Sequence, residues 1–151
     1  MERKFTMSPQ DLEALWQEHL AGEFVTKDVE ATLKTMTDDA TVDHIPVHTG
    51  GSGKHALRAF YRDIFIPSWP ADLKQTPINR VIGQDQVVDE IRTEFTHDRP
   101  MDWFLPGVPP TGKKIDVTIV AVVQFRDGKI ASERIYWDQA TVLRQIGLLT
   151  P

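Results

Sequence analysis

The sequence predicts an α+β fold in which helices pack on one face of a curved, mainly antiparallel sheet. Apolar residues recur at helical spacing in the first half of the chain, whereas four strand-like segments follow one another in the second half. A short amphipathic segment ends the pattern. Helices and strands that are segregated in this way indicate an α+β plan. A sheet that curves around helices leaves an open end, which is a natural place for a pocket.

Three helices and one short strand are expected before residue 66. Ser8 and Pro9 are a typical N-cap and first helical residue, and Gly22 is a typical helix stop. The other two helices are expected over residues 27–37 and 53–65, with a strand over residues 41–47 between them. The glycine-rich stretch 48–54 lacks the spacing of a phosphate-binding loop, so we interpret it as a flexible turn with Ser52 capping the third helix.

The second half predicts four strands in consecutive antiparallel pairs and then a short helix. The strands are expected over residues 75–82, 87–98, 114–125 and 129–137, and the helix over residues 139–146. In the second of these strands the odd-numbered residues are the more apolar, so they should face the core. The loop 98–113 carries Trp103, Phe104 and Leu105, which something must cover.

Composition excludes several classes of protein. The 151 residues, 40% hydrophobic and 26% charged, predict a single globular domain over residues 1–151. A formal net charge of −5 without a basic run argues against nucleic-acid binding. The chain has no cysteine, which fits a reducing cytoplasm. It also has no apolar run of the roughly 20 residues that cross a membrane.

Several stretches carry a resemblance to a known family. They are Pro109–Gly112, Phe125–Ile130, Glu133 with Trp137–Asp138, Leu143–Leu149, Asp43–His44 and Leu57–Tyr61. Together they resemble the NTF2-like superfamily, a cone-shaped α+β barrel, and within it the SnoaL-like polyketide cyclases and the ketosteroid isomerase-like proteins. The resemblance covers nearly the whole chain. It implies a homodimer formed through the open face of the sheet, and an enzyme without cofactors that uses an acidic side chain in the cone.

Asp138 is the acidic residue to which the resemblance assigns this acid/base role. It lies where the last strand gives way to the last helix, beside Trp137 and Tyr136. Burial there would raise the pKa of its carboxyl toward the working pH. Asp is also a preferred N-cap, so a purely structural role for Asp138 is an equal alternative.

Two histidines complete the expected catalytic group. His97 shares the apolar face of its strand with Phe95, and Asp102 is near enough in sequence to orient it. The alternative is a histidine that only bonds loop groups. Asp43 and His44 are adjacent, so on a strand one at most faces the pocket, and the family pattern favours His44.

Aromatic residues are the expected walls for a planar, apolar ligand. The candidates for substrate binding are Tyr61, Trp69, Trp103, Tyr136 and Phe95. The alternative is that they are ordinary core residues, which is the more usual role of aromatics at such positions and the favoured one for Tyr61. No metal site is expected, because the histidines and acids lack tight ligand spacing.

The sequence therefore predicts a small cytoplasmic acid/base enzyme that acts on an apolar carbonyl compound in an enclosed pocket. Cyclase, isomerase, dehydratase or lactone-processing reactions all fit the expected residues. The alternative is a non-catalytic module that binds a small ligand or forms a dimer.

Overall fold

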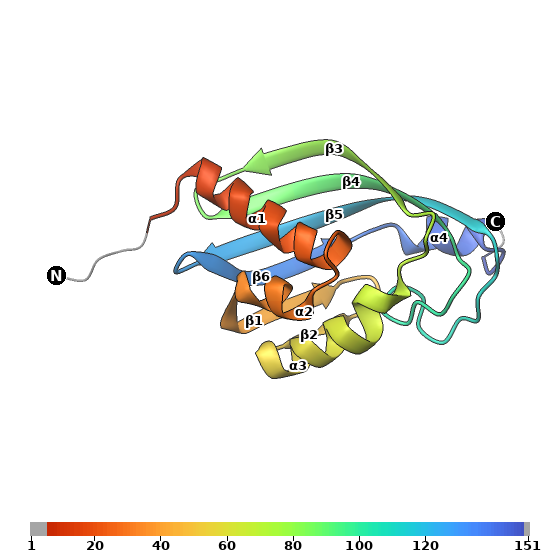
Figure 1. Ribbon diagram of the computed structural model, residues 1–151. Coiled ribbons are helices and arrows are strands. Elements are labelled where there is room, and N and C mark those ends of the chain that lie inside the picture. The colour runs from red at the N-terminus through yellow and green to blue at the C-terminus, as the bar shows by residue number, and fades with distance from the viewer. Residues whose placement is uncertain (1–5, 150–151) are drawn as a thin grey trace.

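A six-stranded mixed sheet forms the body of the computed structural model, which describes residues 6–149 (Figure 1). The strands are β1 (Met36–His44), β2 (Thr49–Ser52), β3 (Lys74–Ile82), β4 (Gln86–Thr96), β5 (Lys114–Arg126) and β6 (Lys129–Tyr136). Their order across the sheet is β2-β1-β6-β5-β4-β3, so the sheet is open, with β2 and β3 at its edges. Strands β1 and β6 run parallel, and every other neighbouring pair is antiparallel.

The consecutive strands β3 to β6 confirm the predicted second half. Alternation along β4 buries Val87, Thr93 and Phe95, so the odd-numbered face points inward as expected. Helix α4 (Gln139–Gln145) follows β6, also as expected. The loop aromatics Trp103 and Phe104 are buried, and the body of the molecule covers them.

Helix α1 (Pro9–Phe24) begins as predicted but ends later. Ser8 caps it in a reciprocal capping box with Asp11. Gly22 does not stop the helix. A Cβ at Gly22 would lie 2.5 Å from Thr32 Oγ1, so this glycine allows α1 and α2 (Val29–Lys34) to approach closely.

The boundary between α2 and β1 differs from the predicted one. The predicted helix ran to residue 37 and the strand began at residue 41, whereas α2 ends at Lys34 and β1 begins at Met36. Met36 pairs with Ile130 of β6. Sheet pairing, a tertiary effect, therefore overrides the helical pattern at this point.

The glycine-rich stretch is an edge strand and not a flexible turn. Strand β2 pairs antiparallel with β1, and a Cβ at Gly50 would lie 1.9 Å from the carbonyl oxygen of Val42. Only glycine fits there. Ser52 ends β2 and does not cap the next helix, because the N-cap position is Gly53, which makes no side-chain cap.

The expected helix over residues 53–65 is divided into two segments, and a third helical segment follows it. Helix α3 (Lys54–Ala59) continues as the π-helix η1 (Phe60–Phe65) and the 3-10 helix η2 (Ile66–Ser68). The wider turn of η1 buries Phe60, Tyr61 and Phe65. Helices α1, α2 and α3 all lie on one face of the curved sheet (Figure 1).

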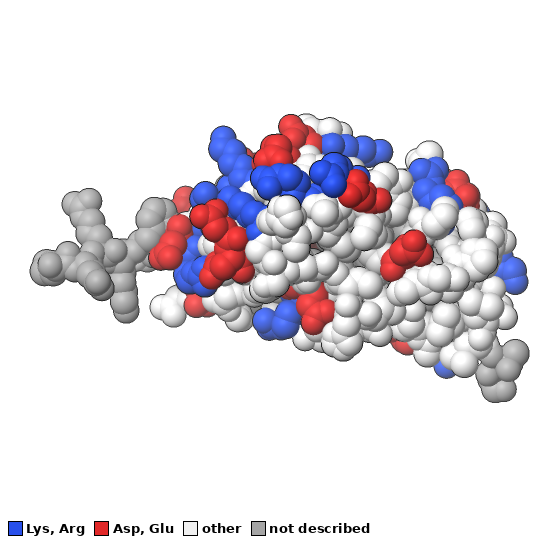
Figure 2. All heavy atoms as spheres, turned by 90° about the horizontal axis from the view of Figure 1, so that it is seen from below, with Lys and Arg blue, Asp and Glu red and all other residues white. Residues whose placement is uncertain are grey.

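The surface offers no continuous basic area on the face seen in Figure 2. Lys and Arg side chains alternate there with Asp and Glu, and a broad part of the face carries neither. Within residues 6–149, no helix is long and apolar enough to cross a membrane.

Candidate functional site

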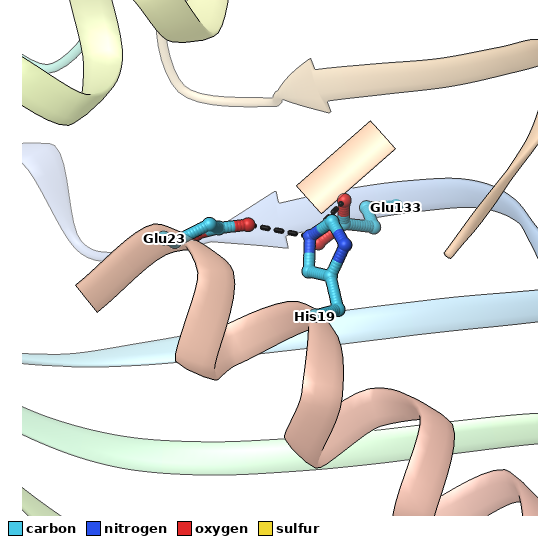
Figure 3. A group of neighbouring side chains, drawn as sticks. All are labelled: His19, Glu23 and Glu133. Atoms are coloured by element: carbon cyan, nitrogen blue, oxygen red, sulfur yellow. Dashed lines mark ion pairs between the residues drawn. The ribbon is translucent and has the colours of Figure 1, made fainter. Parts of the chain in front are cut away.

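Three buried ionisable side chains meet between α1 and the sheet. His19 and Glu23 lie one turn apart on the inner face of α1, and Glu133 comes from β6 (Figure 3). His19 Nε2 lies 2.5 Å from Glu23 Oε1 and 3.2 Å from Glu133 Oε2. Neither contact is aligned as a hydrogen bond from the ring N–H, so we describe them as charge contacts. We call these three residues the buried triad.

The other nitrogen of His19 is held by a threonine. Thr35 donates its single hydroxyl hydrogen to the carbonyl oxygen of Thr32, at 2.6 Å. The hydroxyl oxygen must therefore accept from His19 Nδ1–H, at 2.8 Å. This bond fixes the ring so that Nε2 points between the two carboxylates.

The charges within the buried triad shift one another's pKa values. Burial opposes a charge on His19, but the carboxylates of Glu133 and Glu23 outweigh it and raise the pKa of the imidazole to about 10. Burial raises the pKa of the Glu23 carboxyl, although His19 opposes this. For Glu133, burial is outweighed by the charge of His19 and by a hydrogen bond from Tyr61, so its pKa is lowered.

A small cavity of about 50 Å³ lies beside the buried triad. Two triad residues, Glu23 and Glu133, contribute to its wall together with His44. The rest of the wall is mainly apolar and aromatic, and includes Trp16, Phe24, Phe65, Trp69, Trp103, Ile91 and Ile135. Ligand pockets usually measure roughly 300–1,000 Å³. The enclosed pocket expected from the sequence therefore corresponds here to a small space with room for a few water molecules.

His44 is a buried, neutral histidine on the cavity wall. Its ring packs among Phe60, Phe65 and Trp103, with the Trp103 ring centroid 4.8 Å away. Nδ1–H donates to the carbonyl oxygen of Thr49 at 2.9 Å, which leaves the lone pair on Nε2. Burial lowers the pKa of His44 to about 4, so the imidazole is uncharged at neutral pH.

Two tryptophans on the cavity wall differ in their hydrogen bonding. Trp103 Nε1–H donates to Ser68 Oγ at 2.7 Å. Trp69 Nε1–H is buried and has no partner among the described residues. The Trp69 ring lies on the cavity wall, and its buried donor without a partner is unfavourable for stability.

Asp138 does not point into the cavity, which corrects the expectation that β6 delivers it there. Its side chain is exposed and caps α4, accepting from Thr141 N at 3.2 Å and from Thr141 Oγ1 at 2.7 Å. These hydrogen bonds lower the pKa of its carboxyl. The structural alternative, an N-cap, is the arrangement that the structure shows.

The remaining predicted residues also lie apart from the cavity wall. His97 is buried, and its Nδ1 contacts Thr111 Oγ1 at 3.0 Å, while Asp102 accepts from Gly107 N and does not orient it. Phe95 packs in the core against Trp69 and Phe104, and Tyr136 is exposed at the surface. Tyr61 lies behind the cavity and donates to Glu133. Of the predicted residues, the structure brings His44, Trp69 and Trp103 together on the cavity wall.

Sequence reasoning missed the buried triad as a unit. His19 lies on the apolar stripe of the first helix, where a histidine is ordinarily interpreted as part of the core, and Glu23 follows it at helical spacing. The signal that could have been used is this i, i+4 pair, because it places an acid on the buried face of α1. That Glu133 faces the pair depends on the register of β6 against its neighbours, which no local pattern shows.

The chain matches one protein-family model and many solved structures of the same fold. The model of the SnoaL-like domain family matches residues 16–133. A search of the curated proteins found no match. Among solved structures, a protein described as a SnoaL-like polyketide cyclase from Jannaschia sp. CCS1 is 22% identical, with complete coverage of both chains and a TM-score of 0.75.

Two further solved structures show the same fold. TsrD from Streptomyces laurentii is 20% identical over 95% of this chain and 99% of its own, with a TM-score of 0.73. A protein with a ketosteroid isomerase-like fold from Catenulispora acidiphila, in complex with trimethylamine, is 16% identical over 91% of this chain and 97% of its own, with a TM-score of 0.66. At these identities the likeness concerns the fold alone.

Proposed function

Because the chain belongs to the SnoaL-like domain family, we propose that it is a small acid/base enzyme acting on an apolar carbonyl compound. The observation that carries the proposal is a buried, uncharged histidine on the wall of an aromatic cavity, beside a buried carboxylate. Reactions that begin with removal of a proton next to a carbonyl, as in isomerisation, cyclisation or dehydration, need such a base. Which of these reactions follows depends on the substrate.

His44 is the proposed base. Its Nδ1–H bond to Thr49 fixes the tautomer, and its low pKa keeps Nε2 unprotonated at neutral pH. A base of low pKa is intrinsically weak, but protonation of His44 during the reaction would be favoured by the nearby carboxylate of Glu133. The pair therefore combines a resting neutral base with a negative charge that stabilises its protonated form.

Trp69 is the proposed partner of the substrate carbonyl. Its unpaired Nε1–H would donate to the carbonyl oxygen, which carries increasing negative charge as an enolate forms. Trp103 and Phe65 would lie against an apolar substrate body. Since the cavity measures about 50 Å³, the substrate is small or the aromatic wall moves when it binds.

The proposal is tested by an assay of proton exchange, which does not require the product of the reaction to be known. The protein is incubated in D₂O with a panel of enolisable ketones and lactones, and deuterium uptake next to the carbonyl is followed by NMR. We expect uptake for at least one compound and a loss of about 10²–10⁴-fold in His44→Gln, the usual contribution of a general base. His97→Gln is the matched control, because His97 is equally buried but lies outside the cavity wall. Equal loss in both variants contradicts the role of His44.

A non-catalytic binding module is the second candidate, and the mainly apolar, aromatic wall of the cavity favours it. In that case native mass spectrometry finds a retained small molecule that is never converted, and no compound of the panel exchanges. A homodimer through the sheet, as the family resemblance implies, is compatible with either function. Ile78 and Val81 of β3 are each 54% exposed and would lie in such an interface. Ile78→Asp then converts the dimer to a monomer in light scattering.

A further inference from the structure

We propose that the buried triad, His19, Glu23 and Glu133, is a binding site for one divalent transition-metal ion. The inference goes beyond the proposed acid/base function, which needs His44 and Trp69 whether or not an ion binds. It also departs from the sequence-based expectation of no metal, because the three ligands come from two distant segments that only the fold brings together.

The first argument is the identity and spacing of the ligand atoms. One imidazole nitrogen and two carboxylate oxygens lie within 4.8 Å of one another. These are the ligand types of Zn²⁺, Mn²⁺ and Fe²⁺. With metal–ligand bonds of about 2.0–2.1 Å, tetrahedral ligand atoms are separated by roughly 3.3 Å. The His19–Glu133 separation of 3.2 Å already fits, and Glu23 needs to withdraw by less than about 1 Å from its 2.5 Å contact.

The second argument is the orientation of His19. Its Nδ1–H bond to Thr35, itself fixed by Thr32, leaves Nε2 aimed between two carboxylates with no hydrogen-bond partner among the described residues. A metal-bound histidine usually donates its second N–H to an oxygen acceptor in this way. Tyr61, which donates to Glu133, would orient that carboxylate in the same manner.

The third argument is charge. Glu23 and Glu133 are both buried, and within residues 6–149 neither forms an ion pair with a lysine or an arginine. With His19 neutral, two negative charges would share an apolar interior, which is strongly unfavourable. A divalent cation balances both charges at once, whereas without it they are balanced only if one proton lies on His19 and a second lies on one of the two carboxylates.

The fourth argument is room for further ligands. Glu23 and Glu133 both reach the cavity wall, so an ion bound to them would face a space that holds a few water molecules. Three protein ligands and an open side are typical of reactive metal sites, whereas structural sites are closed by four. The site would therefore take an ion that keeps exchangeable water.

Metal binding is measured directly, without an activity assay. The purified full-length chain is dialysed against EDTA and then titrated with Zn²⁺ by calorimetry and with Co²⁺ by visible absorption. We expect one equivalent of each, a rise in Tm with Zn²⁺, and a Co²⁺ spectrum of low coordination number. Mg²⁺, which prefers oxygen ligands and water, should bind much more weakly.

Variants locate the ion. Glu23→Gln and Glu133→Gln preserve shape, and each should weaken Zn²⁺ binding by at least about 100-fold; Thr35→Val, which removes only the orienting hydroxyl, should weaken it by about 10–100-fold. The control is His48→Ala, since His48 and Asp43 form an exposed pair that could bind Zn²⁺ adventitiously. Circular dichroism shows whether each variant folds, and Thr35→Val keeps all three ligands if a Gln variant does not fold.

Two results overturn the site. One is the absence of stoichiometric Zn²⁺ or Co²⁺ binding to the folded wild-type chain. The other is binding that survives Glu23→Gln and Thr35→Val but disappears in His48→Ala. Either outcome leaves the proposal for His44 intact. Conversely, if His44→Gln and Trp69→Phe both keep full exchange activity, the proposed function is contradicted and the metal site is not affected.

Discussion

Glu133 and Asp138 are two acids at the same end of the chain with opposite environments. Glu133 points from β6 into the interior, where it meets His19 and Tyr61 and borders the cavity. Asp138 follows the last residue of β6, and its side chain lies in solvent as a helix cap. The comparison shows that the residue carrying the more suggestive sequence context, an acid beside two aromatics, is not the one that the fold places at the cavity.

The largest expected effect is on the stability of the protein, which should fall far more when Glu133 is replaced than when Asp138 is replaced. Glu133→Ala removes one of the two buried carboxylates beside His19 and the carboxylate that accepts from the Tyr61 hydroxyl, so it should lower the free energy of unfolding by about 3–5 kcal/mol. Urea denaturation in EDTA measures this, with an unchanged m value as a check that the compared states are the same. A loss no larger than that of Asp138→Ala would show that Glu133 is not held as the structure places it.

The second effect concerns pH. The pKa of His44 is lowered to about 4 from its ordinary value of 6.5, so the unfolded chain binds this proton more readily than the folded chain does. The free energy of unfolding is therefore unaffected by the titration of His44 above pH 6.5. It decreases as the pH falls from 6.5 toward 4, by roughly 3 kcal/mol in total, because the unfolded chain takes up the proton first.

The matched variant isolates that contribution. His44→Gln lacks the titrating group, so the difference in unfolding free energy between wild type and variant should shrink as the pH falls through this window. Glu133 and Asp43 are the charged groups that act on His44, and both remain in the variant. A difference that is constant from pH 7 to pH 4.5 would contradict a buried neutral His44.

The third effect compares the two tryptophans of the cavity wall. Trp69→Phe removes an unpaired donor, so it should lower kcat/KM for an exchanging ketone about 5–10-fold, the worth of one hydrogen bond to the developing enolate oxygen. Both Trp→Phe variants lose buried packing, but Trp103→Phe also removes a donor that is paired with Ser68, so it should lower stability by about 1 kcal/mol more than Trp69→Phe does. The reverse pattern would mean that Trp69 does not contact the substrate.

The smallest effect belongs to Asp138. Asn caps helices as well as Asp does, so Asp138→Asn should change neither stability nor proton exchange measurably, whereas Asp138→Ala should destabilise α4 slightly. Thermal unfolding measures the stability of both Asp138 variants, and the NMR exchange assay measures their activity. A large loss of exchange in Asp138→Asn would restore this residue to the mechanism.

The sequence predicted the sheet well because its signals are local. Alternation along residues 87–98 and the Asp127–Gly128 turn are properties of neighbouring residues, and both appear in the structure as expected. The boundaries near residues 35–53 were wrong for the opposite reason. The pairing of Met36 with Ile130, and the close approach of Gly50 to Val42, depend on segments far apart in the chain.

The candidate site was predicted less well, and the reason is also physical. Strand alternation predicted that one at most of Asp43 and His44 faces the pocket, the family resemblance favoured His44, and His44 is buried. The place of Asp138 could not be predicted, since the same residue type serves caps and active sites. Glu23 looked like an ordinary helix acid, and only the packing of α1 against β6 brings it to Glu133.

One measurement tests most directly whether the chemistry belongs to the cavity and not to the cap. The values of kcat/KM for deuterium exchange are compared among wild type, His44→Gln and Asp138→Asn with the same carbonyl compound. The cavity-centred account predicts a loss of about 100-fold or more in His44→Gln and no change in Asp138→Asn. A full-rate His44→Gln with an inactive Asp138→Asn would contradict it.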